Sequence, residues 1–182
     1  MVGSQLLSIN TKTFFNTSGH ERLGKAPMDD NSLNNIAPHL NPVWPCDSLV
    51  VADLSSHGMP GRFEQFWTRR VSDTVFEISC IPFFSYGIAL GDKVEVNEGC
   101  VIQKVVERGG HKTLRVAVAN KKNLDHLHEV LHEWVEKTGL LYEWYASGYL
   151  AVDVPPDAQA ELNTSLLDQL RGAGEISTEL DQ

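Results

Sequence analysis

The chain has 182 residues, enough for one ordinary domain or for two small units that share a core. Hydrophobic residues make up 42% and charged residues 21%, which favours a packed core and argues against a disordered chain. The formal net charge is −9, so the protein is a poor general ligand for nucleic-acid phosphates or anionic lipids. We therefore expect no nucleic-acid and no membrane partner, and the charge instead suits a basic protein partner.

The cysteines and the first residues indicate a compartment. Cys46, Cys80 and Cys100 are an odd and sparse set, which does not form a disulfide framework. The first ten residues lack the basic and apolar regions of a signal peptide, and the longest apolar stretch, residues 80–91, is too short to span a membrane. These features predict a cytoplasmic protein with reduced thiols.

Residues 1–60 differ in composition from the rest of the chain. They are rich in Asn, Ser, Pro, Gly and His, and neither helical nor strand periodicity persists in them, although residues 49–54 are strand-like. We predict an irregular N-terminal extension over 1–60. From 61 to 110, short aromatic and β-branched runs alternate with turn residues, as in the run around Val94 and Val96. This pattern predicts a small, strongly bent β-rich subdomain that resembles a barrel.

From residue 111 the period changes. After a strand over 113–118, apolar residues recur at 3.6-residue spacing and predict a helix that ends at Gly139. Two strands follow across Ser147-Gly148, and Pro155-Pro156-Asp157 predicts the start of a second helix before a last strand over 176–180. The fold class is thus α+β, and residues 111–182 are expected to form a ferredoxin-like β-α-β-β-α-β subdomain behind the barrel-like sheet.

The first predicted helix contains His128-Glu129-Val130-Leu131-His132, which matches the H-E-x-x-H pattern of zinc proteases. At roughly 100° per residue, His128 lies about 70° and His132 about 110° away from the centre of the apolar face, and Glu129 points to the opposite side, into water. A catalytic zinc site needs all three groups in one sheltered cleft. We therefore reject this motif and expect no metal and no cofactor.

A second candidate is Arg108-Gly-Gly-His-Lys-Thr-Leu-Arg. A double-glycine turn brings His111 to the start of a strand, with Thr113 and Arg115 on the same side of that strand. A histidine, a hydroxyl and a guanidinium together can bind a phosphate or act on a nucleotide. The favoured interpretation is a buried, hydrogen-bonded histidine where the two subdomains meet, and a phosphate- or nucleotide-directed enzyme or ligand-binding domain is the alternative.

Acidic residues gather in the second half of the chain. Residues 111–182 carry six basic and twelve acidic side chains, a net charge of −6. These carboxylates form either a solvated surface or a patch that steers a basic partner. The residues expected to contact such a partner are Asp125, Glu129, Glu133, Glu136, Glu143, Asp157 and Glu161.

Four segments of the chain resemble a known family. They are Phe63-Glu-Gln-Phe-Trp, then Ile81-Pro-Phe-Phe-Ser-Tyr-Gly-Ile-Ala-Leu-Gly-Asp-Lys-Val, then Val105-Val-Glu-Arg-Gly-Gly-His-Lys-Thr-Leu-Arg-Val, and Leu150-Ala-Val-Asp-Val-Pro-Pro-Asp. Over about residues 62–182 they are similar to a family of small bacterial proteins catalogued as domain of unknown function 4265. The resemblance implies one folded unit from residue 62 onward and brings no assigned reaction.

These observations favour a non-catalytic, cytoplasmic protein-binding module. The most concrete expectation is an immunity or antitoxin protein that neutralises a basic toxin domain with its acidic surface, because the chain is small, acidic on one half and without a convincing catalytic constellation.

Overall fold

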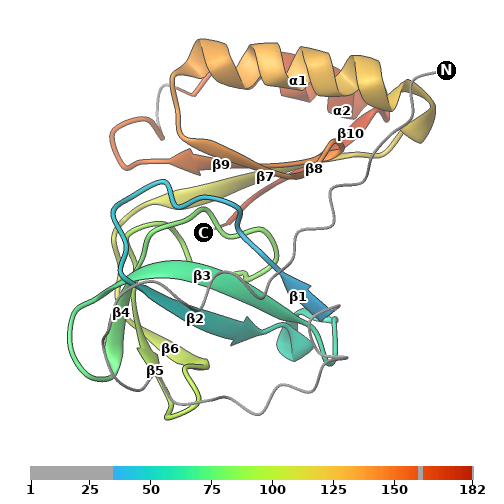
Figure 1. The fold of residues 1–182 in the computed structure, drawn as a ribbon. Helices are drawn as coiled ribbons and strands as arrows, with labels where there is room; N and C mark the ends of the chain where they lie inside the picture. Colours follow the sequence, from blue (N-terminus) through green and yellow to red (C-terminus); the bar gives the residue numbers. More distant parts are fainter. Residues whose placement is uncertain (1–34, 160–161, 182) are drawn as a thin grey trace, which may run out of the picture.

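A computed structural model describes residues 35–159 and 162–181 of the chain. These residues form two sheets and two helices in three layers (Figure 1). Helices α1 (Leu124–Thr138) and α2 (Ser165–Gly172) cover one face of a four-stranded sheet, and a six-stranded sheet lies on its other side. The fold class is therefore α+β, with sheet predominating. Within the described residues, neither helix is long and apolar enough to cross a membrane.

The six-stranded sheet contains the first strands of the chain. They are β1 (Ile36–Ala37), β2 (Ser48–Asp53), β3 (Phe63–Arg70), β4 (Val75–Ile78), β5 (Lys93–Val96) and β6 (Ile102–Glu107). The order is β1-β3-β4-β5-β6, and β2 pairs with β3. Buried and more exposed residues alternate along β3, β4 and β5, which explains why their period-2 pattern predicted strands.

The expected barrel-like sheet is wrong, because this sheet is open. A barrel needs a continuous ladder between its first and last strands. Here β2 reaches the chain just before β6 through a single bridge, Val51 to Val101, and a hydrogen bond from the Val51 N–H to the Cys100 carbonyl. The pairing of β5 with β6 is itself irregular, with two register shifts. The sheet therefore bends strongly without closing.

The expectation of an irregular extension over 1–60 also needs correction. Residues 1–34 lie outside the described part of the chain. Strand β2 pairs with β3 in antiparallel register from Ser48–Thr68 to Asp53–Phe63, and β1 pairs with β3 in parallel. Single-sequence periodicity missed β1, because two residues are too few to show alternation. These strands make the second half of the predicted extension part of the sheet.

The four-stranded sheet consists of β7 (Lys112–Val118), β8 (Tyr142–Ala146), β9 (Tyr149–Val154) and β10 (Ile176–Leu180). Its order is β10-β7-β9-β8, and all neighbours are antiparallel. Its apolar face packs against the helices through residues such as Val116, Val152 and Leu131. Its other face, toward the six-stranded sheet, carries polar and charged side chains, including Thr113 and Arg115.

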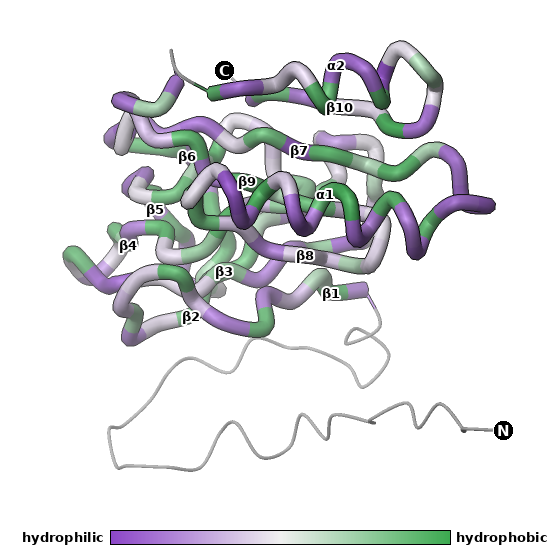
Figure 2. Tube along the Cα trace, turned by 90° about the horizontal axis from the view of Figure 1, so that it is seen from above, coloured by the Kyte–Doolittle hydropathy of each residue, from purple (hydrophilic) through white to green (hydrophobic). Residues whose placement is uncertain are grey.

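The two helices differ in how well their sequence predicted them. Helix α1 buries Leu127, Leu131, Trp134 and Val135, and it ends at Gly139, which adopts φ 68°. Hydrophilic and hydrophobic residues alternate along its trace (Figure 2). The second helix was expected to start at residues 155–157, but those residues form turns and α2 begins at Ser165.

The side chain of Asn163 explains this later start. Its Oδ1 accepts from the Ser165 N–H at 3.0 Å and so forms a turn directly before the helix. Upstream, Gln159 donates to the Gly110 carbonyl at 3.1 Å, which holds the segment after β9 against the double-glycine turn.

Candidate functional site

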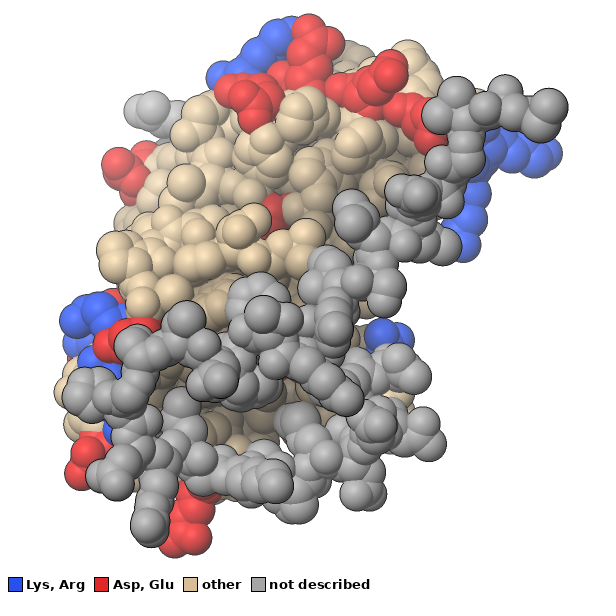
Figure 3. All heavy atoms as spheres, in the orientation of Figure 1, with Lys and Arg blue, Asp and Glu red and all other residues tan. Residues whose placement is uncertain are grey.

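The outer face of α1 carries four exposed carboxylates, Asp125, Glu129, Glu133 and Glu136. In Figure 3 acidic side chains gather along the upper edge, where Figure 1 places α1, and the face below them is largely uncharged. Glu133 pairs with Lys137 at 2.7 Å, and Glu136 accepts from the Tyr142 hydroxyl. Among the described residues, Asp125 and Glu129 have no ion-pair partner. The helix thus presents this row of charge to the solvent.

The other predicted contact residues do not all share this surface. Asp157 is exposed, in the turns after β9, while Glu161 lies outside the described residues. The structure corrects the expectation that Glu143 contacts a partner, because only 11% of its side chain is exposed and it points toward the six-stranded sheet. Its carboxylate accepts from the Ile81 N–H at 2.8 Å and lies 2.7 Å from His39 Nδ1. Glu143 sits on the sheet face turned away from α1, so it does not belong to the acidic surface.

The H-E-x-x-H residues lie where helical geometry predicted. His128 Nδ1 lies 2.9 Å from the Ser147 carbonyl, and its ring packs on Trp144 with centroids 4.2 Å apart. His132 stacks beside His128 at 6.1 Å, and Glu129 is exposed. In the part of the chain that the structure describes, no group of three or more His, Cys, Asp or Glu residues is arranged to hold a metal ion.

His111 lies at the start of β7, as the double glycine before it predicted. Its Nδ1 contacts both carboxylate oxygens of Asp153, at 2.9 and 3.0 Å. Burial raises the pKa of Asp153, and the neighbouring His111 opposes this rise. Gly109 allows the turn to pack tightly, because a Cβ there would lie 2.7 Å from the backbone carbon of Gly91. The sequence therefore delivers a histidine–aspartate pair to the junction between the two sheets.

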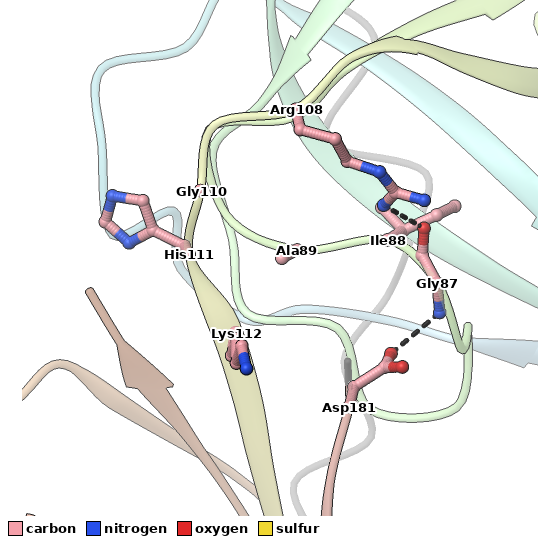
Figure 4. A pocket seen from close by; sticks show the side chains of 8 residues that line it. All are labelled: Gly87, Ile88, Ala89, Arg108, Gly110, His111, Lys112 and Asp181. Carbon is pink, nitrogen blue, oxygen red and sulfur yellow. Dashed lines mark hydrogen bonds between the residues drawn. The ribbon is translucent and has the colours of Figure 1, made fainter. Parts of the chain in front are cut away.

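A pocket of about 240 Å³ opens beside this turn, and Figure 4 shows its lining. Arg108 donates to the Gly87 carbonyl at 2.6 Å and to Asp92 at 2.9 Å, and Asp181 accepts from the Gly87 N–H at 2.7 Å. The ring of His111 points away from Arg108 and Asp181 (Figure 4). Arg108 and Asp181 therefore hold the loop at Gly87 and do not converge on the histidine.

Arg115 and Thr113 do not join His111 in an open site. Arg115 is 3% exposed, and its guanidinium donates to the carbonyls of Phe83 and Ser85 at 2.7 and 3.1 Å. The same group contacts Asp181 at 3.3 Å. Thr113 is 1% exposed, and its hydroxyl has no hydrogen-bond partner among the described residues. The three residues share one strand face, as expected, but two of them are buried between the sheets.

The most heavily buried charged group is one that the sequence did not reveal. Glu64 on β3 is fully buried and accepts from the backbone N–H groups of Phe83, Phe84 and Ser85. His39, which follows β1, lies 3.1 Å from Glu64 through Nε2 and stacks on Phe83 with ring centroids 4.4 Å apart. Together with the contact from His39 to Glu143, this forms one chain of hydrogen bonds from β3 to β8.

The environment sets the ionisation of Glu64. Burial favours its neutral form, but hydrogen bonds from His39, from Ser85 and from the Phe83 backbone outweigh burial and lower the pKa of Glu64. Glu64 sits within the alternating pattern of β3 at a position that the pattern marks as buried. A charged residue on the inward phase of a strand was the signal that could have pointed to this network.

The fold and these contacts define a protein of two packed sheets, with a row of exposed carboxylates on α1 and a buried network of charged groups between the sheets. The chain belongs to the family described as Domain of unknown function (DUF4265), whose sequence profile matches residues 64–178. It is also similar in fold to a hypothetical protein from Neisseria gonorrhoeae, with a TM-score of 0.55 and 20% sequence identity. That likeness covers 75% of this chain and 94% of the other. No curated protein matches the chain.

Proposed function

We propose that this protein is a non-catalytic binding module that holds a basic protein partner against the exposed carboxylates of α1. The observation that carries the proposal is the row formed by Asp125, Glu129 and Glu133, which are spaced four residues apart on one exposed helix face. Like charges at this spacing destabilise a helix by a few tenths of a kcal/mol per pair. Only Glu133 gains an internal cation, Lys137. A basic partner would offset this cost through complementary charge.

The most concrete version of the proposal is an immunity or antitoxin protein that covers a basic toxin domain. Its support is the concentration of negative charge in residues 111–182 and the use of Arg115 and Glu143 in internal contacts. The competing hypothesis, a phosphate- or nucleotide-directed site at His111, Thr113 and Arg115, is less well supported. The guanidinium that it requires already binds two carbonyls and Asp181.

We further propose that the unit from β7 to β10 is ferredoxin-like and that the protein acts in the cytoplasm. The first assignment is supported by the element order β7-α1-β8-β9-α2-β10 and by the two helices on one face of an antiparallel sheet (Figure 1). The second is supported by three free cysteines, which suit a reducing compartment.

The test of the binding function uses the purified product of the gene adjacent to this one as the probe. Isothermal titration calorimetry should detect a complex at micromolar concentration that weakens as salt is added, because exposed charges are screened. The variant Asp125→Lys/Glu129→Lys should weaken binding at least tenfold. The control Asp73→Lys/Glu98→Lys makes the same change of charge at two exposed positions of the six-stranded sheet and should bind normally. Absence of a complex, or equal weakening by both variants, would refute the proposal.

A further inference from the structure

His39 lies between two carboxylates that come from different sheets. Its Nε2 is 3.1 Å from Glu64 of β3, and its Nδ1 is 2.7 Å from Glu143 of β8. The side chains of His39 and Glu64 are 0% exposed and that of Glu143 is 11% exposed. We call these three residues the proton clamp. They form a direct polar link between the six-stranded and the four-stranded sheet.

The backbone fixes the role of both carboxylates. Glu64 accepts from three N–H groups in residues 83–85, including that of Ser85 at 2.7 Å, and Glu143 accepts from the Ile81 N–H at 2.8 Å. A backbone N–H can only donate, so each carboxylate must present lone pairs to the segment that joins β4 to β5. Both carboxylates therefore act as acceptors toward this segment. Both oxygens of Glu64 accept backbone N–H groups, and its ionised form is the one that such hydrogen bonds stabilise.

This arrangement requires one bound proton beyond those of a neutral imidazole. A neutral imidazole has one N–H and one bare nitrogen, whereas both ring nitrogens of His39 lie within hydrogen-bonding distance of carboxylate oxygens. With a neutral ring, one of these two contacts would bring a nitrogen lone pair against a carboxylate lone pair. With the imidazolium, both nitrogens donate. We propose that a proton on His39 clamps the two sheets together, and that its release at alkaline pH loosens the contact of β8 with the six-stranded sheet while each sheet stays folded.

The groups around His39 agree with a stable imidazolium. Burial alone lowers the pKa of His39, but Cys80 and the two carboxylates outweigh burial and raise it well above the ordinary value. Burial raises the pKa of Cys80, and the neighbouring His39 opposes this rise. The ring face of His39 is covered by Phe83, which carries no charge.

Two further polar groups lie beyond Phe83. Arg115 of β7 and Tyr149 of β9 both donate to the Phe83 carbonyl, at 2.7 and 2.9 Å. The positive charge of Arg115 opposes protonation of His39 from this side, and burial raises the pKa of Tyr149 to about 12. His39 therefore loses its proton between the carboxylates of Glu64 and Glu143, with the guanidinium of Arg115 on the far side of Phe83.

Nitrogen-15 NMR of histidine-labelled full-length protein tests the proton directly. At pH about 8, both ring nitrogens of His39 should be protonated. The variant Glu143→Gln should lower the pH at which His39 loses its proton, because it removes one carboxylate charge at constant size. The exposed control Glu136→Gln should leave that pH unchanged. A neutral His39 at pH about 8 in the natural sequence overturns the proposal, and that measurement requires no variant to fold.

Hydrogen exchange tests the coupling between the sheets. Protection of the Ile81 amide, which donates to Glu143, should fall as His39 loses its proton, while protection of Val116 in the centre of β7 persists. The global unfolding constant should rise by up to tenfold per pH unit from pH about 6.5 to the pKa of His39 in the folded protein, because the unfolded state binds fewer protons in that window. Simultaneous loss of protection at both amides, or no loss at Ile81, overturns the role of the clamp.

Discussion

Replacing Glu64 with Gln removes a buried charge at nearly constant volume. In the folded protein, one carboxylate oxygen contacts His39 and the Phe83 N–H, and the other accepts from Phe84 and Ser85 at 3.1 and 2.7 Å. A glutamine oxygen can replace only one of these two, and the amide NH₂ then faces two buried donors. Each unsatisfied buried group costs about 1–3 kcal/mol, so we expect the free energy of unfolding to fall by about 4 kcal/mol.

This loss is large but leaves the protein folded, because domains of this kind unfold with about 5–15 kcal/mol. Chemical denaturation should show a lower midpoint with an unchanged slope, and calorimetry should show a melting temperature lower by roughly 10 °C. The control Glu77→Gln removes a carboxylate that pairs with the half-exposed Arg69, and it should cost about 1 kcal/mol or less. If Glu64→Gln costs no more than this control, the carboxylate does not organise residues 83–85 and the reasoning fails.

Two further substitutions test the packing between the sheets. Gly109→Ala places a methyl group 2.7 Å from the Gly91 backbone, so it should destabilise the protein by about 1–3 kcal/mol in urea denaturation. The control Gly172→Ala meets no atom within 4 Å and should not destabilise the protein. Equal stability of the two variants would contradict the close approach of Gly109 to Gly91. Arg115→Met leaves the buried Ser85 carbonyl without its donor, whereas the Phe83 carbonyl keeps the Tyr149 hydroxyl and Asp181 keeps the Gly87 N–H. It should cost about 1–3 kcal/mol, against about 0.5 kcal/mol for the exposed Arg69→Met. A cost at Arg115 no larger than that of this control would show that its contacts are dispensable.

Local periodicity predicted the elements that show a long, regular pattern. The run around Val94 and Val96 forms β5, and α1 ends at the predicted glycine. The start of α2 was placed too early, because the prolines after β9 also suit the turns that they form. The barrel was wrong because closure depends on pairing between β2 and β6, which no local pattern specifies.

In the candidate site too, local sequence placed some residues correctly and others only the fold could place. Helical spacing alone placed Asp125, Glu129 and Glu133 on the outer face of α1, since side-chain direction on a helix follows from position in the sequence. The count of acidic residues over 111–182 grouped Glu143 with them, although Glu143 lies on β8, points between the sheets and contacts His39, 104 positions earlier.

The sequence by itself determined the class of the longer regular elements, the acidic character of the second half and the histidine at the double-glycine turn, because these depend on neighbouring residues. Only the tertiary structure decided which charges are buried. His39, Glu64 and Glu143 stand far apart in the chain, and their contact exists only once two sheets pack face to face. Water is excluded there, so each charge needs a partner at hydrogen-bonding distance, and that partner can come from any part of the folded chain.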